Sequence, residues 1–483
     1  MTHLLPVEFT VTLDDSHEFA QLSGDFNPLH LDPVAARRSM FGGTVAHGMH
    51  VALRACELLS EHCLPAGTEP AAVTASFSNP LRSGQRVRAR GQSIAANRFR
   101  ITAEADGRPV LSLSMTTRMA TLTAATPHTP SASESPYPVP RVQEFPPLVQ
   151  IGAVHGDIDS ELLLQLFPLL ADRGDTRWLA DLLATTRIVG MECPGMHSVF
   201  SGFKLMRRPD GEIGTSAQMR YFVEKTDVRF RMARIGVVGG YFTGTLDTFF
   251  RPPPVEQPAL ASIMTSVAAE TFASRRALIV GGSRGLGEVA AKLLIAGGAD
   301  VTITYARGFS EASRLQKEAR DCGFDCNIKK LDASDSLRTE DREWLASGNF
   351  SLVCYFASPH IEKNVSESWD EASFQKFVAV YVKGFAAAVG ALVRGHASTG
   401  EPLRVLYPSS VFLDHQEPGF SEYCAAKAAG ESLARHLSRS GRVDVSIPRL
   451  PRMRTDQTSS LTHLDVADPY PIILQALRGL ARC

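Results

Sequence analysis

The chain has 483 residues, of which 44% are hydrophobic and 21% are charged, and its formal net charge is -1. This length predicts two to four domains of ordinary globular composition, and the near-zero charge gives no reason to expect a nucleic acid or an anionic membrane as partner. No apolar run approaches the roughly 20 residues of a transmembrane helix, the N-terminus lacks signal-peptide features, and eight scattered cysteines indicate reduced thiols, so we expect a cytoplasmic protein.

Two proline-rich stretches, 123–147 and 251–260, indicate linkers at 123–147 and 253–272, which separate blocks 1–122, 148–252 and 273–483. The first block predicts a strand, a short helix and then a long apolar helix over about Ala46–Glu61. Four strands follow, several of which alternate in period two: Ala71–Phe77, Arg86–Ile94, Arg98–Ala105 and Val110–Met119. A long helix followed by an antiparallel sheet that could wrap around it predicts an α+β fold.

The second block repeats this plan weakly. A helical region over Glu161–Leu183 precedes strands near Ser198–Met206, Ser216–Phe222, Asp227–Ile235 and Val237–Phe250. We therefore expect a duplicated fold whose second half is structural. The third block alternates strands and helices, with strands at Ala277–Val280, Val301–Tyr305, Ser351–Phe356, Arg404–Tyr407 and Val443–Ile447. This alternation predicts an α/β domain with a doubly wound parallel sheet.

The first candidate site lies in Ser23-Gly24-Asp25-Phe26-Asn27-Pro28-Leu29-His30 and in Phe41-Gly42-Gly43-Thr44-Val45-Ala46-His47-Gly48-Met49. The Asn27-Pro28 turn would let Asp25 and His30 point into one cleft. Dehydration of a 3-hydroxyacyl thioester needs a base near the C2 proton and an acid for the departing C3 hydroxyl, and these side chains can supply both. Gly48 opens the long helix, where a backbone N–H can stabilise charge on the thioester oxygen.

These motifs resemble those of the MaoC-like, (R)-specific enoyl-thioester hydratases over residues of about 8–120. The resemblance implies a hot-dog fold, with Asp25 and His30 as the catalytic pair and the Gly48 amide as oxyanion donor. A helix cap beside a buried histidine is the alternative interpretation of Asp25 and His30. No metal is expected, because His47 and His50 lack a carboxylate partner in the sequence pattern. Modular polyketide synthases also place a double hot-dog dehydratase before a ketoreductase, but their catalytic histidine and aspartate lie in different halves.

A glycine-rich loop between a predicted strand and helix marks the second candidate site. Gly281 allows the turn, Gly285 lets the backbone approach a phosphate, and Gly287 lets helix and strand pack closely. Further along, Tyr423 can give a proton to a carbonyl oxygen that accepts a hydride. Lys427 lies one helical turn on and could lower the pKa of that phenol, while Ser410 could bond the carbonyl. A solvated helix face is the alternative interpretation of Tyr423 and Lys427.

The ordered set resembles the short-chain dehydrogenase/reductase family over residues of about 275–460. The resemblance implies cofactor binding by Gly281, Ser283, Arg284, Gly285, Leu286, Gly287, Arg307, Asp332, Tyr423, Lys427 and Thr455. The second strand ends at Thr304-Tyr305-Ala306-Arg307 without a carboxylate for the ribose, whereas Arg284 and Arg307 could meet a 2′-phosphate, so NADPH is the predicted cofactor. Two segments depart from the family pattern: Tyr355-Phe356-Ala357-Ser358, and Tyr381 at the usual asparagine of the proton relay.

Together the blocks predict a bifunctional enzyme with an N-terminal double hot-dog and a C-terminal Rossmann-like domain. We expect it to reduce a 3-oxoacyl thioester with NADPH and to dehydrate the (R)-3-hydroxyacyl product to a trans-2-enoyl thioester, in fatty-acid or polyketide-like biosynthesis. The oxidative direction is one alternative, and one inactive domain serving as an acyl-binding or assembly module is another. The expected partners are an acyl-CoA or acyl-carrier-protein thioester substrate, the carrier protein itself, and a second copy of the chain in a homodimer.

Overall fold

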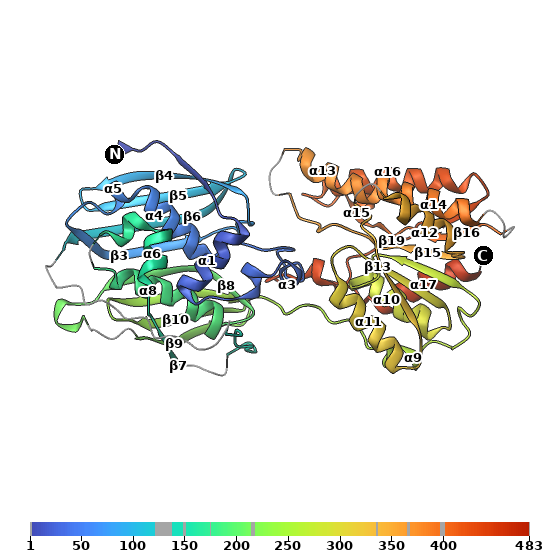
Figure 1. Ribbon diagram of the computed structural model, residues 1–483, viewed down its shortest axis with the longest axis horizontal. Coiled ribbons are helices and arrows are strands. Elements are labelled where there is room, and N and C mark those ends of the chain that lie inside the picture. Colours follow the sequence, from blue (N-terminus) through green and yellow to red (C-terminus); the bar gives the residue numbers. More distant parts are fainter. Residues whose placement is uncertain are drawn as a thin grey trace. The chain divides into compact units, whose positions relative to one another are not determined.

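The computed structural model describes residues 2–120, 138–147, 151–173, 175–213, 218–334, 337–364, 368–396 and 401–482. The chain divides into two compact units, shown in Figure 1: Met1–Pro253 with Ser460–His463, and Pro254–Ser459 with Leu464–Cys483. Residues 123–137 of the first predicted linker lie outside the described residues.

The N-terminal unit is built on one 11-stranded antiparallel sheet, in the order β1-β4-β5-β6-β3-β8-β11-β10-β9-β7 with β2 paired to β4. The strands are β1 (Thr2–His3), β2 (Val7–Thr10), β3 (Thr68–Phe77), β4 (Arg86–Ala95), β5 (Arg98–Ala105), β6 (Arg108–Met119), β7 (Ile151–His155), β8 (Ser198–Arg207), β9 (Gln218–Asp227), β10 (Met232–Val238) and β11 (Phe242–Phe250). The pairing of β3 with β8, from Ala72↔Met206 to Ser76↔Gly202, joins the strands of the first and second halves. The two predicted half-domains therefore share a continuous sheet.

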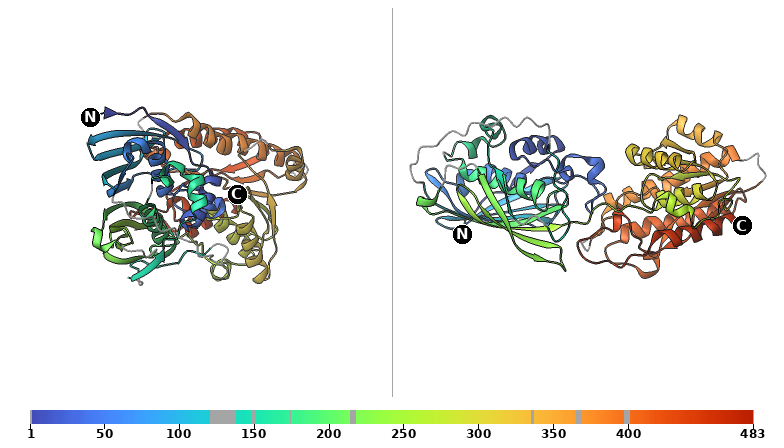
Figure 2. Two further views of the ribbon diagram at one scale, coloured as in Figure 1. Left: turned by 60° about the vertical axis from the view of Figure 1, so that its left-hand side comes forward. Right: turned by 90° about the horizontal axis from the view of Figure 1, so that it is seen from below.

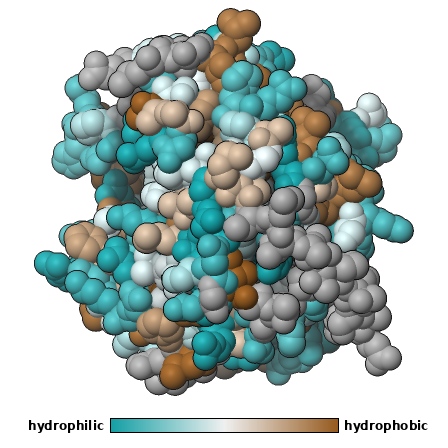
Figure 3. Space-filling model, turned by 90° about the vertical axis from the view of Figure 1, so that its left-hand side faces the viewer, coloured by the Kyte–Doolittle hydropathy of each residue, from teal (hydrophilic) through white to brown (hydrophobic). Residues whose placement is uncertain are grey.

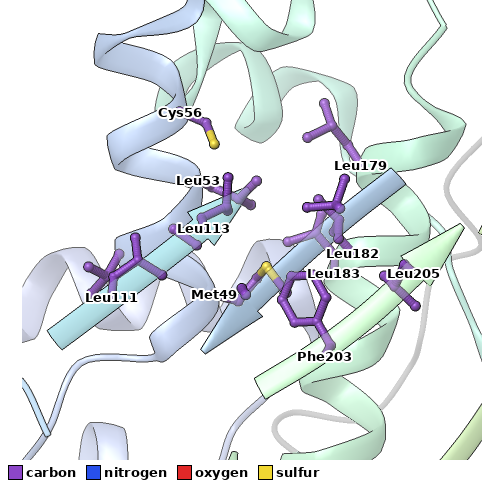
Figure 4. Close-up of a cluster of buried hydrophobic side chains, with 14 of the residues drawn as sticks. Met49, Leu53, Cys56, Leu111, Leu113, Leu179, Leu182, Leu183, Phe203 and Leu205 are labelled. Carbon is purple, nitrogen blue, oxygen red and sulfur yellow. The ribbon is translucent and has the colours of Figure 1, made fainter. Parts of the chain in front are cut away.

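Helices of the N-terminal unit gather on one face of this sheet, as the two views of Figure 2 show. They are α1 (Leu13–Ser23), α2 (Pro28–Leu31), α3 (Pro33–Ala36), α4 (Gly48–Leu58), α5 (Ser60–Cys63), α6 (Ser160–Leu166), α7 (Pro168–Ala171) and α8 (Arg177–Arg187), which continues into a π-helical turn, η1 (Ile188–Glu192). Figure 4 shows Met49 and Leu53 of α4 and Leu182 of α8 packed over inward-facing residues such as Leu113 and Phe203. One hydrophobic core thus contains both long helices.

Successive side chains along the strands lie alternately on the buried and the exposed face of the sheet. In β5 the burial pattern alternates strictly over its first six residues, from an exposed Arg98 to a buried Ala103, as the period-two sequence predicts. On the face of the N-terminal unit drawn in Figure 3, hydrophilic side chains are interspersed with apolar ones. The short edge strand β7, which carries a glycine at Gly152, is not anticipated by the sequence analysis.

The C-terminal unit has a six-stranded parallel sheet in the order β14-β13-β12-β15-β16-β18. Its strands are β12 (Arg276–Val280), β13 (Asp300–Tyr305), β14 (Cys326–Lys330), β15 (Leu352–Tyr355), β16 (Leu403–Leu406) and β18 (Val443–Ser446), and β17 (Ser409–Ser410) pairs separately with β19 (Arg449–Leu450). Numbered within the unit, the order is 3-2-1-4-5-6, the Rossmann arrangement, in which ligands bind where the strand order reverses, between β12 and β15.

Helices cover both faces of the parallel sheet. They are α9 (Leu260–Met264), α10 (Gly285–Ala296), α11 (Phe309–Asp321), α12 (Thr339–Ser347), α13 (Glu371–Val378), α14 (Phe385–His396), α15 (Phe412–His415), α16 (Ser421–Ser438) and α17 (Pro469–Arg482), with a second π-helical turn, η3 (Ala379–Gly384), between α13 and α14. Along β12, Ala277 and Ile279 face one hydrophobic core and Leu278 and Val280 the other. Burial on both faces explains why the parallel strands read as continuous apolar runs.

The helical stretch Glu371–His396 is long and apolar enough to cross a membrane by length and composition alone. Half of its most apolar window is buried within the structure, where Phe377, Phe385 and Leu392 pack in a hydrophobic core of the C-terminal unit. The stretch therefore has the character of a helix packed on a sheet.

Candidate active sites

The turn that holds Asp25 and His30 is fixed at both ends. Helix α1 ends at Gly24, whose φ of 72° is in the left-handed region that glycine tolerates best. Asn27 caps α2 through its side-chain oxygen, which accepts from the amide of Leu29 at 3.1 Å. The Asn27 amide nitrogen donates to the carbonyls of Gly190 and Gly195, each at 3.0 Å. The turn is therefore anchored on the second half of the unit.

One ring nitrogen of His30 forms a hydrogen bond with the backbone, and the other is available to accept a proton. Its Nδ1 lies 2.7 Å from the carbonyl oxygen of Val45, which can only accept, so Nδ1 carries the proton and Nε2 has a lone pair. Burial lowers the pKa of His30, and the charge on Asp25 opposes that shift. A neutral imidazole with a free Nε2 is suited to act as a base.

Asp25 is 2% exposed, and both of its carboxylate oxygens accept hydrogen bonds. Oδ1 accepts from the amide of Asn27 at 3.2 Å, and Oδ2 accepts from the hydroxyl of Thr186 at 2.8 Å. Burial raises the pKa of Asp25, while His30 and these hydrogen bonds oppose the rise. Burial thus shifts the pKa of Asp25 up and that of His30 down, so it favours the neutral form of each group: a carboxylic acid that can give a proton and an imidazole that can accept one.

Gly48, the third predicted member of this site, is the first residue of α4. Its amide has no acceptor within the helix because the first turn of an α-helix leaves its N–H groups unpaired. A Cβ at this position would lie 2.9 Å from the ring of Phe77, so only glycine allows that ring so close to the helix start. His47, immediately before Gly48, donates from Nε2 to the Asp25 carbonyl at 3.0 Å, which brings the helix start next to the acid–base pair.

A metal-binding interpretation arises from the same cluster. Ligand atoms of Asp25, His30 and His47 lie within 4.8 Å of one another. The expectation that His47 lacks a carboxylate partner is wrong: its Nε2 lies 4.0 Å from Oδ2 of Asp25, which the fold brings there from the preceding turn. That Nε2 also bonds the Asp25 carbonyl, so its proton is committed, whereas a metal ligand must offer a lone pair. His50 stacks on Phe19 instead, with ring centroids 4.6 Å apart. The donor set favours acid–base chemistry.

Three residues of the second half surround this site without having been predicted. Thr186 binds the Asp25 carboxylate, and a Cβ at Gly190 would overlap Asp25 Oδ1. Arg251 is only 6% exposed, donates to the carbonyl of Met196 and contributes to the lowered pKa of His30. All three lie more than 150 residues from Asp25 in the chain, so no local pattern indicates them.

The glycine-rich loop of the C-terminal unit forms the cradle that a dinucleotide requires. Gly281 has a φ of 81°, and a Cβ there would lie 2.7 Å from the amide nitrogen of Ala357. A Cβ at Gly287 would overlap the carbonyl of Gly281, so the close contact of helix and loop depends on that glycine. Gly285 is the first residue of α10, and a Cβ on it would have the Thr455 side chain as its nearest neighbour, 3.9 Å away. These residues fit a phosphate at the helix N-terminus.

The other predicted cofactor residues lie in the loop itself, beside Thr455, and just after the strands β13 and β14. Arg284 pairs with Asp456 at 3.4 Å, next to Thr455, and Ser283 is buried. Arg307, just beyond β13, is exposed. Asp332 follows β14 and accepts hydrogen bonds from the amide and the hydroxyl of Ser334 at 2.9 and 2.6 Å. Leu286, the second residue of α10, packs against a hydrophobic core of the C-terminal unit.

Ser410, Tyr423 and Lys427 are all buried in the C-terminal unit. The Ser410 side chain hydrogen-bonds the Tyr423 phenol, whose pKa burial raises to about 12. Burial also lowers the pKa of the Lys427 ammonium, to about 7, while Glu431 opposes the fall, and the lowering of the phenol pKa by Lys427 stays a prediction. Tyr423 and Lys427 are buried, which contradicts the alternative of a solvated helix face.

The surroundings of Lys427 differ from the family pattern, as the sequence indicates. Its Nζ lies 3.9 Å from the ring centroid of Tyr381 and donates to the Pro408 carbonyl at 2.8 Å. Tyr381 lies in the π-helical turn η3; its carbonyl accepts from the Tyr407 hydroxyl at 3.1 Å, and its hydroxyl lies 2.7 Å from that of Ser358. The hydroxyls of Ser358 and Tyr381, one from each segment that differs from the family pattern, thus bond each other.

Comparisons with known proteins agree with the division of the chain into an N-terminal and a C-terminal unit. Residues 2–108 match the family described as MaoC like domain, and residues 275–461 match the family described as short chain dehydrogenase. The chain is 35% identical over 103 residues to an (R)-specific enoyl-CoA hydratase of Aeromonas caviae, a match that covers 21% of this chain and 69% of the relative. It is 32% identical over 84 residues to a 3-hydroxybutyryl-CoA dehydratase of Methylorubrum extorquens, covering 17% of this chain and 52% of that protein.

A third relative is a mitochondrial 3-hydroxyacyl-[acyl-carrier-protein] dehydratase of Arabidopsis thaliana, 34% identical over 86 residues, 17% of this chain and 48% of the relative. The chain thus spans about half the length of two of these three relatives. Among solved structures, a short chain dehydrogenase from Burkholderia cenocepacia J2315 in complex with NADP is 21% identical, with a TM-score of 0.39 over 44% of this chain and 91% of that one. A dehydrogenase/reductase from Sinorhizobium meliloti 1021 is 22% identical, with a TM-score of 0.37 over 46% and 92%.

Proposed function

Since the chain belongs to the MaoC-like dehydratase family through its N-terminal domain and to the short-chain dehydrogenase family through its C-terminal domain, we propose that it performs two consecutive steps on one acyl thioester. The C-terminal domain reduces a 3-oxoacyl thioester with NADPH, and the N-terminal domain dehydrates the (R)-3-hydroxyacyl product to a trans-2-enoyl thioester. The observation that carries the dehydration step is the opposed pair of Asp25 and His30 beside the start of α4.

In the dehydration, Nε2 of His30 removes the C2 proton, and the carboxylic acid of Asp25 protonates the C3 hydroxyl, which leaves as water. The electrons of the C–H bond become the C2–C3 double bond. Negative charge on the thioester oxygen is stabilised by the Gly48 amide, where the dipole of α4 adds a partial positive charge. Transfer of the proton from His30 back to Asp25 restores the pair for the next cycle.

In the reduction, the nicotinamide cofactor supplies the hydride, and the residues of the glycine-rich loop and of α10 would hold its phosphates. The Tyr423 hydroxyl gives its proton to the substrate carbonyl oxygen, and Ser410 orients that carbonyl by a hydrogen bond. Lys427, when protonated, stabilises the phenolate that remains. Arg284 and Arg307 would pair with a 2′-phosphate, which supports NADPH over NADH.

The reductive direction is favoured by this cofactor assignment, and the three relatives support acyl thioesters as substrates, because their names refer to enoyl-CoA, hydroxybutyryl-CoA and hydroxyacyl-carrier-protein. The oxidative sequence, hydration followed by oxidation, would use the same residues in reverse. The oxidative sequence can be measured with crotonyl-CoA and NADP⁺ as starting compounds. If its conversion exceeds that of the reductive sequence, the proposed direction is contradicted.

The first test is NADPH oxidation by the full chain with acetoacetyl-CoA, with mass spectrometry of the products. Crotonyl-CoA as product would support both steps on a CoA thioester, and 3-hydroxybutyryl-CoA alone would contradict the dehydratase assignment for this substrate. Asp25→Asn should stop the sequence at 3-hydroxybutyryl-CoA, whereas Tyr423→Phe should abolish NADPH oxidation. Unchanged reduction by Tyr423→Phe would overturn the reductase assignment.

A catalytically silent C-terminal domain is the second candidate, and one observation favours it. The carbonyl of Tyr381 is already bonded by Tyr407, and Lys427 is enclosed by the rings of both tyrosines, so the surroundings of the ammonium differ from the usual relay. In that case the domain would bind NADPH, measured by quenching of protein fluorescence, without oxidising it in the presence of any acyl thioester. Hydration of crotonyl-CoA would remain.

A further inference from the structure

The carboxylate of Asp25 is enclosed by residues from the other half of the N-terminal domain. Thr186, on the last turn of α8, donates to Oδ2 at 2.8 Å. Gly190, in the π-helical turn η1, lies so close that a Cβ on it would overlap Oδ1. Asp25 and Thr186 are both buried, so no bulk water competes for this hydrogen bond.

Resting on the proposed function, we propose that Thr186 and Gly190 are positioning residues of the dehydratase site: Thr186 orients the Asp25 carboxyl through its hydroxyl, and Gly190 leaves the space that this orientation requires. The second half of the domain, whose sequence does not repeat the Asp-x4-His arrangement, would then have a specific role in the reaction beyond completing the sheet.

The chemistry of a hydroxyl suits this role. A threonine hydroxyl can donate to a carboxylate and can accept from a carboxylic acid by rotating its proton. Asp25 must exist in both forms during one catalytic cycle, and Thr186 can bond either form without moving. A backbone N–H in the same place could only donate, so it could not accept a hydrogen bond from the O–H of the carboxylic acid. The isosteric valine has neither capacity, so Thr186→Val removes the hydrogen bond while it preserves the volume of the side chain.

The local backbone also fits this interpretation. π-Helical turns are rare in proteins, and those that do occur are often found at functional sites. Here the turn Ile188–Glu192 follows α8 directly, and its Gly190 serves twice: its missing side chain makes room for Asp25, and its carbonyl accepts from Asn27 at 3.0 Å. The neighbouring Thr185 differs from Thr186, because its hydroxyl bonds the Leu182 carbonyl within the helix at 2.7 Å. It offers a matched control in the same buried helix.

The test measures hydration of crotonyl-CoA by the full chain across pH. Thr186→Val should lower kcat about tenfold with KM within about twofold, and should move the Asp25-dependent limb of the kcat profile about one unit to higher pH, because the lost donor favoured the carboxylate. Thr186→Ser should restore both values. Thr185→Val should leave both unchanged, and Gly190→Ala should lower kcat at least as much as Thr186→Val.

Two outcomes would overturn the inference: a wild-type kcat and pH profile for Thr186→Val, or equal losses in Thr186→Val and Thr185→Val without a shift of the profile. Asp25→Asn separates this failure from failure of the proposed function. If Asp25→Asn hydrates normally, the proposed function is wrong; if it is inactive while Thr186→Val is unaffected, only the positioning role is wrong. Circular dichroism spectra and thermal unfolding of each variant establish that it is folded.

Discussion

The imidazole rings of His30 and His47 stack with their centroids 3.8 Å apart and their planes inclined by 28°. Burial lowers the pKa of both rings, and for His47 the proximity of His30 lowers the pKa further. Two imidazolium ions at this separation would repel each other strongly, so the stack favours the state in which at least one ring is neutral. The proximity of His30 therefore contributes to keeping His47 neutral.

His47→Phe should lower the kcat for hydration about tenfold, because phenylalanine can stack on His30 but cannot donate to the carbonyl of Asp25. His50→Phe is the matched control: His50 lies one turn along the same helix and stacks on Phe19, away from the acid–base pair. Steady-state kinetics with crotonyl-CoA measure both variants. Equal losses in the two would indicate that only the packing of α4 had been disturbed.

The pH dependence of dehydration should have an acid limb below the ordinary histidine value of 6.5, because burial lowers the pKa of His30. The base must be neutral, so kcat/KM for 3-hydroxybutyryl-CoA should rise as pH increases through the pKa of His30. An acid limb centred above pH 6.5 would instead indicate that an ionised Asp25 dominates the surroundings of His30.

Asp25→Asn should stabilise the N-terminal domain at alkaline pH while it abolishes dehydration. The pKa of Asp25 is raised above its ordinary value of 3.8 in the folded state, so its contribution to stability is present below pH 3.8 and is lost as pH rises through the raised pKa. The gain in Tm of the variant over wild type should therefore be larger at about pH 8 than at about pH 4. A gain independent of pH would contradict this origin.

Reduction should decline as pH rises above about 7, the pKa to which burial lowers Lys427. The protonated ammonium stabilises the Tyr423 phenolate, so its loss removes that stabilisation. Initial rates of NADPH oxidation with acetoacetyl-CoA, measured between about pH 6 and about pH 9, test this expectation. Lys427→Arg, which stays charged over this range, should show no such decline in whatever activity it retains. A flat wild-type profile would show that the charge on Lys427 does not limit the rate.

Much of the fold follows from local patterns. The strictly alternating strand β5 occurs with its predicted bounds, Arg98–Ala105, and the apolar runs of the C-terminal unit form the parallel sheet that they predict. The edge strand β7 was missed because five residues containing a glycine carry little periodicity. The predicted strand Asp227–Ile235 is divided in the structure, with Asp227 ending β9 and Met232 starting β10, since the turn between them has no Gly–Asn or Pro–Gly signal.

The sequence predicted the part of the candidate site that lies within one segment of the chain. Asp25 and His30 lie on a single turn, so their proximity is a local property. The contact between Asp25 and Thr186 spans 161 residues and depends on how β3 meets β8, which no spacing in the sequence specifies. The lowered pKa of Lys427 likewise reflects burial beside the rings of Tyr381 and Tyr407, which come from two separate segments of the chain.

The pairing of β3 with β8 has a consequence for how the enzyme behaves in dilute solution. A site assembled from two separate subunits weakens as the protein is diluted below its dissociation constant. Here the loop with Asp25 and the helix with Thr186 belong to one polypeptide, so their effective concentration is set by the chain and not by the amount of enzyme present. Activity per molecule of the N-terminal domain should therefore be the same at nanomolar as at micromolar enzyme. The covalent connection also leaves each half free to change independently, because a substitution in one half is not copied into the other.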